Sequence, residues 1–547
     1  MKKSIKLCFC IGFSLSLWIV SGCGKNFLDV QNPNQITEVQ FWKNENDVLA
    51  ALASVYSPLR IPLSGYWGAF NGFQDINAMG DDVYTIPGEE PSTWQVATFI
   101  FDSKNSDLNN IFDKLYKAIY RANLVAANVD KAPIAGDKKK LYMAEVKFLR
   151  GLCYFILASN YGSVPLKTTP SYSAEDNFPA NAPEADVWKQ AINDLSEAKE
   201  GLPVDRTPDE LGRATSGAAL AFLGKAYLYM KDYGKAQTTF DLLTQAPYHY
   251  GLVDNFEDNF TDKNEFNKEA VFQWVYGDFG SAYNPWGEES KNAGMFNYIP
   301  QFIGTPKGGG WFKYVPSAYF VDQFFKELRP PGRDTKFDKR MYATLAWKYS
   351  DFGEQDVTWY NNQSFEALWQ SALPKIDKFA KTDYPLDTRT HGKFLIKKFT
   401  NSYRNDKDAD NYWGAKPSTA NYVIMRYAEV LLMRAEAAIR NGNNAVAIND
   451  INSIRVRAGL PAKTSAELPD VTSIMDEISH QKLLELFMEQ NRWNDLKRWY
   501  AADALKSHFI TVKKQGDKQF EPKHYKFPIP ASELLTNPNV KQAPLWQ

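Results

Sequence analysis

Apolar residues in the amino-terminal half of the chain recur at the three- and four-residue steps that place them on one face of a helix. Three such stripes run through Ile111, Leu115, Ile119, Ala122, Ala126 and Val129, then Leu141, Ala144, Phe148, Leu152 and Phe155, and then Val187, Ala191, Leu195 and Ala198. Gly201 and Pro203 follow the third stripe, as is typical of a helix end. We therefore predict a mostly α fold in which each helix buries one face.

A hairpin pattern of two short helices occurs twice. Its first copy has the spacing of a tetratricopeptide hairpin, in which small residues let two helices approach closely, at Leu223, Gly224, Tyr227, Tyr233, Ala236 and Phe240. The second copy repeats that spacing at Ala435, Ala438, Ala447 and Ile451. Hairpins this far apart cannot stack as a simple solenoid. The chain between them is therefore predicted to be an insertion that leaves a helical platform and rejoins it.

The insertion, residues 255–417, has a different composition from the helical regions. It is rich in Gly, Pro, Asn and aromatic residues and has few long helical periods. Residues 270–276 within it have the composition of a strand. Residues 62–94 have the same loop-like character. Because binding residues concentrate on loops carried by a rigid scaffold, we expect these two segments to hold the functional surface.

The first residues form a secretory signal. Met1-Lys2-Lys3 is followed by an apolar stretch over 7–20 and by Ser21-Gly22-Cys23. This order is typical of a signal peptide over 1–22, and the stretch is too short for a transmembrane helix. A cysteine directly after the small residues is similar to the lipobox of bacterial lipoproteins, which implies a diacylglycerol on Cys23 and firm membrane attachment. The alternative is an ordinary signal peptide with a chance cysteine.

Cysteine usage fits such a lipoprotein. Cys8 and Cys10 would leave with the signal and Cys23 would carry lipid, so only Cys153 remains in the mature chain. No intrachain disulfide is therefore expected, although the compartment would permit one. Cys153 lies on an apolar helical face with Leu149, so we expect a buried structural thiol.

Chain length predicts the number of domains, and net charge bears on which partners the protein can bind. The chain has 547 residues, which exceeds the ~250–300 at which a single core stops growing, so two domains are expected. The formal net charge is −1 and no long basic run is present, which argues against nucleic acid as a partner.

Several short motifs follow the lipobox along nearly the whole chain. They are Phe27-Leu28-Asp29, residues 144–151 (AEVKFLRG), 161–166 (YGSVPL), 426–437 (RYAEVLLMRAEA), 451–460 (INSIRVRAGL), 491–499 (NRWNDLKRW), 527–530 (FPIP) and 537–539 (NPN). In this order they resemble the motifs of the SusD/RagB family of outer-membrane nutrient-binding lipoproteins. Residues 481–486 (QKLLEL) and the carboxyl end depart from the usual family pattern, which bears on the subfamily more than on the fold.

The resemblance implies a fold and a role. The fold would be a SusD-like platform of tetratricopeptide-type hairpins with an irregular insertion, divided into an amino-terminal domain over 23–230 and a carboxyl-terminal domain over 265–547 that includes the loop-rich insertion. The role would be to capture a nutrient outside the cell and deliver it to a SusC-like TonB-dependent transporter. The protein would be lipid-anchored in the cell outer membrane and face the exterior.

Catalytic and metal-binding patterns have little support. The five histidines are far apart, and neither His-Glu-x-x-His nor Cys-x-x-Cys occurs, so no zinc site is expected. Gly308-Gly309-Gly310 lacks the rest of a phosphate loop, and Ser479-x-x-Lys482 lacks its companion motifs. The acidic pairs at 81–82, 89–90 and 288–289 cannot face each other across a sugar as a glycosidase dyad would. We predict no enzyme activity, catalytic residue, cofactor or metal.

One acidic segment resembles the start of a calcium loop. Asp406, Asp408 and Asp410 have the alternating spacing of such a loop. Asn411 stands where an EF-hand has Gly, and Pro417 stands where it needs Glu. A polar solvent loop is therefore the preferred interpretation.

Aromatic residues are the strongest candidates for ligand binding. The chain has 15 Trp, 29 Tyr and 35 Phe. The apolar C–H faces of a sugar pack flat on Trp and Tyr, while its hydroxyl groups pair with Asn, Asp and Arg. For any single ring core packing is the favoured interpretation, but we expect two or three in the loop segments to line a site. The candidate ligand-binding residues are Trp67, Asp81, Trp94, Trp274, Tyr276, Tyr283, Trp286, Trp311 and Tyr314.

These observations favour a lipoprotein that binds an oligosaccharide or polysaccharide. One alternative keeps the architecture but binds peptides or another oligomer, as RagB-like members imply. Another is a helical-repeat adaptor for proteins, which an aromatic-rich insertion disfavours because an adaptor needs only the hairpins. The identity and length of the ligand stay open at this point.

Overall fold

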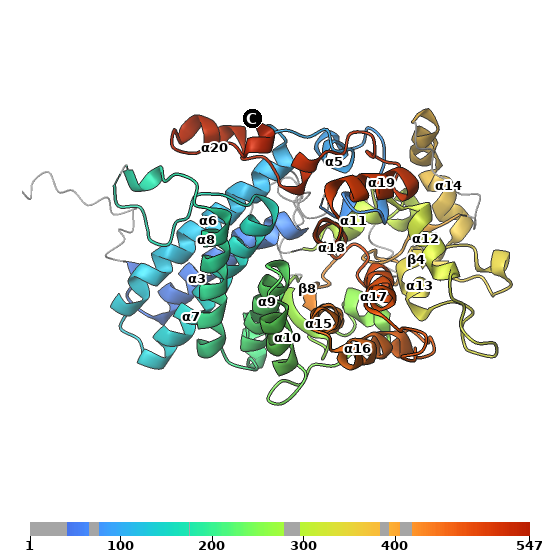
Figure 1. Ribbon diagram of the computed structural model, residues 1–547, viewed down its shortest axis with the longest axis horizontal. Helices are drawn as coiled ribbons and strands as arrows, with labels where there is room; N and C mark the ends of the chain where they lie inside the picture. Colours follow the sequence, from blue (N-terminus) through green and yellow to red (C-terminus); the bar gives the residue numbers. More distant parts are fainter. Residues whose placement is uncertain (1–40, 65–75, 174, 278–295, 383–392, 405–417) are drawn as a thin grey trace, which may run out of the picture.

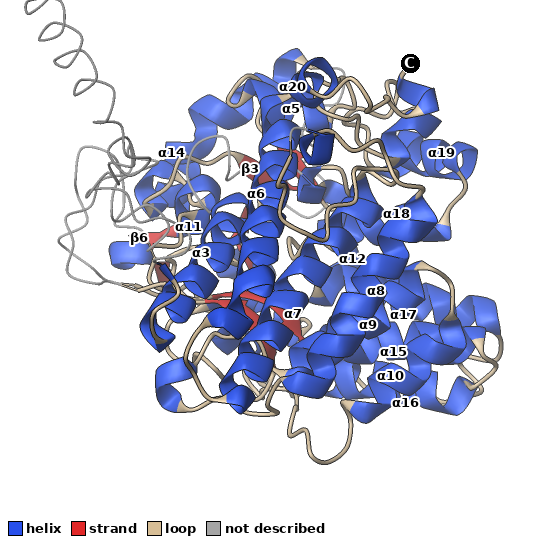
Figure 2. Cartoon of the chain, turned by 90° about the vertical axis from the view of Figure 1, so that its left-hand side faces the viewer, coloured by secondary structure: helices blue, strands red, loops and turns tan. Residues whose placement is uncertain are grey.

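The computed structural model describes residues 41–547 except 65–75, 174, 278–295, 383–392 and 405–417 (Figure 1). Helices make up most of the structure, as Figure 2 shows, and the strands of the described part form four two-stranded sheets. The predicted mostly α-helical fold is confirmed. Within these residues no helix has both the length and the apolar character that a membrane crossing requires. Cys23 and the predicted signal peptide lie outside the described residues.

Four long helices form the amino-terminal part of the platform. They are α3 (Glu45–Ser64), α6 (Ser106–Asn128), α7 (Gly136–Asn160) and α8 (Glu184–Gly201), and consecutive members pack against each other. The Asn105 side chain begins α6 by accepting hydrogen bonds from the backbone amides of Asp107 and Leu108. Ile111 and Ile119 of the first predicted stripe are fully buried in this core. Cys153 is also fully buried, and burial raises the pKa of its thiol, so the predicted structural role is confirmed.

Two helical hairpins form the lower part of the molecule in Figure 1. They consist of α9 (Ser216–Tyr229) with α10 (Tyr233–Leu242), and of α15 (Tyr427–Arg440) with α16 (Asn444–Arg457). A Cβ added at Gly224 would lie 2.5 Å from the Phe240 ring, so only glycine allows α9 and α10 to come this close. Helices α10 and α15 pack together, and the Asn441 side chain donates to the Tyr233 carbonyl at 2.9 Å. The two hairpins are therefore neighbours in space despite the chain between them.

Two paired strands mark where that intervening chain leaves the platform and returns. Strand β2 (Ala270–Trp274) pairs antiparallel with β8 (Tyr422–Arg426). The strand predicted over 270–276 thus exists and ends two residues early. Because the two strands are hydrogen-bonded neighbours, the insertion begins and ends at one place on the helical scaffold.

A buried ion cluster fixes this exit point. The Arg426 guanidinium, at the end of β8, is fully buried and donates to the Glu489 carboxylate at 2.8 Å from both Nε and Nη2. Its Nη1 donates to Glu485 at 2.9 Å and also to Glu269, which directly precedes β2. Lys398 of the insertion donates to Glu489 at 2.5 Å. Both ends of the insertion are therefore tied to the same buried charges.

The remaining elements complete the insertion and the carboxyl-terminal part. The helices are α5 (Pro91–Ala97), α11 (Ile299–Ile303), α12 (Ala318–Phe325), α13 (Lys339–Thr344), α14 (Phe365–Ile376), α17 (Val471–Glu485), α18 (Arg492–Trp499), α19 (Ala502–Val512) and α20 (Ala531–Thr536). The strands are β1 (Val83–Thr85), β3 (Tyr314–Pro316), β4 (Leu345–Ala346), β5 (Thr358–Trp359), β6 (Gln363–Ser364) and β7 (Leu395–Ile396).

Candidate ligand-binding site

A two-stranded ribbon brings together the two loop-like segments in which the sequence places candidate ligand residues. Strand β1 pairs antiparallel with β3, with Tyr84 opposite Val315. The pairing continues beyond the strands, because the Ile86 amide donates to the Lys313 carbonyl at 2.9 Å. We call this unit, residues 83–86 and 313–316, the β1–β3 ribbon. It gives the two distant segments one common support.

Trp311 precedes this ribbon in a tightly folded loop. Its amide donates to the Gln301 carbonyl, and the next two amides along the chain donate to Gly304 and Phe302. A Cβ at Gly310 would lie 2.2 Å from the Gly304 carbonyl oxygen, so the chain can fold back here only at glycine. The Trp311 ring packs edge-on against Phe302, with centroids 5.1 Å apart. Trp311 remains half-buried and is held on a rigid backbone.

Trp94 lies on the other segment, in the short helix α5. Its amide donates to the Glu90 carbonyl at 2.8 Å, and the Thr98 hydroxyl donates to the Trp94 carbonyl at 2.6 Å. The side chain is half-buried, as is that of Trp311. These two tryptophans are the predicted candidates among the described residues that are not enclosed in the core.

A carboxylate surrounded by lysines fixes the ribbon to α14. Glu89 pairs with Lys313 at 3.1 Å, with Lys375 at 2.8 Å and with Lys378. Burial alone would raise the pKa of Glu89, but the hydrogen bonds from the three lysines lower it to about 2. Glu89 is therefore ionised at any physiological pH. Lys375 also donates to the Trp311 carbonyl, which connects the cluster to the candidate ring.

Three predicted ligand residues are instead part of the core. Trp274 and Tyr314 are each 1% exposed, and Tyr276 is 4% exposed. Trp274 packs edge-on against Phe272, with ring centroids 4.9 Å apart, and residues 271–274 of β2 are all buried. Enclosed rings cannot stack on a ligand in this structure, so the prediction that these three residues bind ligand is wrong.

Asp81, which was also predicted to bind ligand, is instead the carboxylate of a buried ion pair. It is fully buried, and Arg492 donates to its two oxygens at 2.6 and 2.7 Å. His508 Nε2 lies 2.7 Å from Oδ2. Burial alone would raise the pKa of Asp81, but the Arg492 charge and the hydrogen bonds hold it well below its usual range. Asp81 therefore joins the start of β1 to α18 and α19 and has no oxygen facing a ligand.

Three other candidates, Trp67, Tyr283 and Trp286, lie outside the described residues, as does the calcium-like segment at 406–410. Among the described residues no group of three or more His, Cys, Asp or Glu side chains could hold a metal ion. The sequence did not predict the cluster of Glu89 with three lysines, because its members come from three distant segments and have no common motif.

Comparison with known proteins decides the family. Residues 268–546 match the model of the SusD family, and residues 26–228 match a family described as starch-binding and associating with the outer membrane. This chain belongs to the SusD family. The resemblance inferred from the sequence motifs is therefore confirmed.

Individual relatives agree with this assignment. SusD-like protein P38 of Formosa agariphila is 25% identical over 531 residues, which cover 91% of each chain. The starch-binding protein SusD of Bacteroides thetaiotaomicron is 24% identical over 429 residues, covering 73% of this chain and 72% of that protein. A crystal structure of a SusD superfamily protein from Bacteroides vulgatus is 29% identical, has a TM-score of 0.76, and matches 92% of this chain and 99% of its own.

Proposed function

We propose that this SusD-family chain is an outer-membrane lipoprotein that binds an oligosaccharide or polysaccharide at the cell exterior. The observation that carries the proposal is the β1–β3 ribbon, which joins the two distant segments: α5, which contains Trp94, contacts β1, and Trp311 lies in the loop directly before β3. Half-buried tryptophans on a fixed backbone supply apolar contact area at little entropic cost. The similarity to a starch-binding relative and the matched family description support carbohydrate as the ligand class.

The proposal includes delivery of the bound glycan to a SusC-like TonB-dependent transporter. This part rests on family membership alone. Stable complexes bury more than ~1,200 Å² in total, so the partner should survive purification in mild detergent. Co-purification of such a transporter with the full chain from outer membranes tests it, and recovery of the chain alone counts against it.

Replacing Trp311 by alanine should weaken glycan binding about thirtyfold, or ~2 kcal/mol, because the ring supplies stacking area. A glycan array first identifies a ligand for the full chain, and calorimetry then compares the affinities of the two proteins. Tyr172→Ala is the matched control, since Tyr172 is 72% exposed and lies in neither loop segment. An unchanged affinity in a folded Trp311→Ala variant would remove this ring from the site.

Replacing Cys23 by alanine should abolish lipid attachment and release the protein from the membrane fraction. The expected cause is the loss of the acyl chains, of which two or more are needed for firm anchoring. Metabolic labelling with a fatty acid, together with membrane fractionation, measures both effects. Unchanged labelling and retention in the variant would contradict the lipobox interpretation.

A further inference from the structure

A pocket of about 420 Å³ lies at the ends of α9 and α10, away from the β1–β3 ribbon. Three stretches of chain line it: residues 204–215 before α9, residues 248–250 after α10, and residues 266–273 leading into β2. The pocket shares no residue with the ribbon. In Figure 1 α9 and α10 lie in the lower half of the molecule, and in Figure 2 β3 lies above them. Its volume falls within the ~300–1,000 Å³ of small-molecule sites.

Two tyrosines form one wall of this pocket. The rings of Tyr248 and Tyr250 are nearly parallel, with an interplanar angle of 8° and centroids 6.1 Å apart. Tyr250 continues the stack onto Tyr427 of α15, again at 6.1 Å. A Cβ at Gly217 would lie 2.1 Å from the Tyr250 hydroxyl oxygen, so α9 carries glycine where this ring must fit. The wall is therefore built into the helical scaffold.

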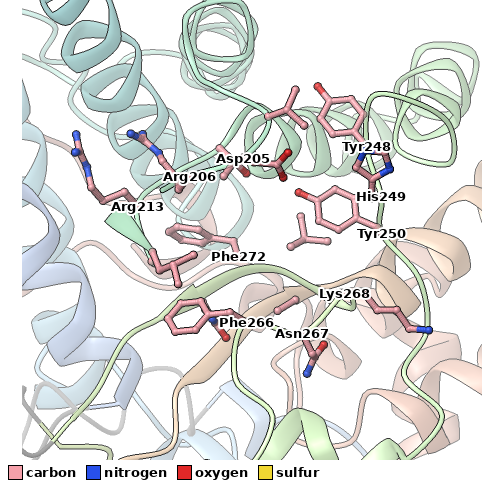
Figure 3. A pocket seen from close by; sticks show the side chains of 17 residues that line it. Asp205, Arg206, Arg213, Tyr248, His249, Tyr250, Phe266, Asn267, Lys268 and Phe272 are labelled. Carbon is pink, nitrogen blue, oxygen red and sulfur yellow. The ribbon is translucent and has the colours of Figure 1, made fainter. Parts of the chain in front are cut away.

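The opposite side combines apolar and polar groups. Figure 3 shows Phe266, Asn267 and Lys268 on the side of the pocket opposite Asp205 and the two tyrosines, with the polar ends of Asn267 and Lys268 directed outward. Phe266 is 37% exposed and has a φ of 54°, a backbone conformation that bulky residues rarely adopt. An exposed aromatic ring in a pocket that also has polar lining residues is typical of a ligand site rather than of a solvent-facing loop.

Charge at the pocket is balanced. Arg206 and Arg213 pair with the buried Glu145 carboxylate at 2.9 and 2.6 Å, and Figure 3 shows both guanidinium groups turned away from the centre. Glu210 also pairs with Arg213. The remaining charges at the rim, Asp205 and Lys268, have opposite signs. The pocket therefore has no excess positive charge that would attract a phosphate, a sulfate or a free carboxylate.

We propose that this pocket is a second carbohydrate-binding site, which takes a neutral oligosaccharide. The inference rests on the proposed function, because it assigns the same ligand class to a second place on the chain. The exposed Phe266 ring would pack on an apolar face of the sugar, beside the stacked Tyr248 and Tyr250. The exposed Asp205 carboxylate would accept hydrogen bonds from its hydroxyl groups. Two sites on one chain would allow a long polysaccharide to be held at two points, which raises its apparent affinity.

The test compares variants of the full chain, purified in detergent. The pocket variant carries Phe266→Ala and Asp205→Asn, both at exposed side chains, so that the fold is preserved. Trp311→Ala removes the other site, and Tyr172→Ala is the control. An array of neutral, uronic-acid and sulfated glycans identifies a ligand, and calorimetry with a short form of it gives the number of sites per chain. Melting temperatures check that every variant is folded.

We expect two sites per chain in the wild type and one in the pocket variant, with the lost site weakened at least about tenfold. The Trp311→Ala variant should keep the pocket site. A single site that Trp311→Ala removes and the pocket variant leaves intact overturns the inference but preserves the proposed function. Binding at the pocket of acidic glycans alone also overturns it. A wild-type chain that binds no glycan removes the proposed function and this inference with it.

Discussion

Replacing Arg426 by alanine should lower the free energy of unfolding by about 3–5 kcal/mol, the usual cost of breaking a buried ion pair from one side. The guanidinium is fully buried and contacts three carboxylates, those of Glu269, Glu485 and Glu489. Alanine would remove the positive charge that all three carboxylates share, and would leave Glu489 with Lys398 and Glu485 with Arg340 and Arg457 as side-chain donors. Urea denaturation of the purified chain measures the change.

The matched control is Arg440→Ala, at the exposed end of α15, the helix that begins directly after Arg426. A surface substitution of this kind should change stability by no more than about 0.5 kcal/mol. Arg426→Lys should also destabilise the protein, because an ammonium group cannot reproduce the planar fork of hydrogen bonds. A loss below about 1 kcal/mol in Arg426→Ala would show that the cluster does not hold the insertion in place.

The helical platform was predictable because its signal is local. The apolar stripes at 111–129 and 187–198 specify which face of each helix is buried, and the structure places α6 and α8 there. The pairing of small and large residues in the hairpins was also visible, since Gly224 faces Phe240 across the contact. Each of these signals spans fewer than about thirty residues of sequence, within the reach of periodicity.

The candidate site was less predictable because its members meet only through the tertiary fold. Glycine, asparagine and aromatic content marked residues 62–94 and 255–417 as loop-like, but composition cannot tell an enclosed ring from an accessible one. Trp274 and Tyr314 are enclosed by neighbours from distant parts of the chain, whereas Trp311 is left half-buried by the fold-back at Gly310. The burial of Asp81 was equally unpredictable from the sequence, because its ion-pair partner Arg492 lies on the distant helix α18.

The pocket beside α9 and α10 had a weak signal in the sequence. Tyr248, His249 and Tyr250 form an aromatic cluster at a loop that follows Pro247, outside the two segments that composition selected. Nothing in the sequence connects them to Phe266 or to Asp205, which reach the same pocket from other loops. Only the packing of α9 against β2 and of α10 against α9 brings these groups together.

Replacing Trp274 by alanine should lower the free energy of unfolding by about 3–5 kcal/mol, because a large buried ring leaves a cavity that its neighbours fill only in part. The ring is 1% exposed and lies between Phe272 and Tyr56, with centroid distances of 4.9 and 6.1 Å. Phe272→Leu is a milder companion variant at the same contact, and it should cost less because most of the volume is kept. Chemical denaturation and melting temperature measure both.

The folded fraction of Trp274→Ala should bind glycan with the wild-type affinity, since the ring has no surface for a ligand. Trp311→Ala should show the reverse pattern, a small loss of stability and a large loss of affinity. Measuring both quantities on both variants therefore separates core tryptophans from site tryptophans without knowledge of the ligand's structure. A Trp274→Ala variant that keeps its stability but loses glycan binding would show that Trp274 belongs to the ligand site. That result would also contradict the burial of Trp274 in the core.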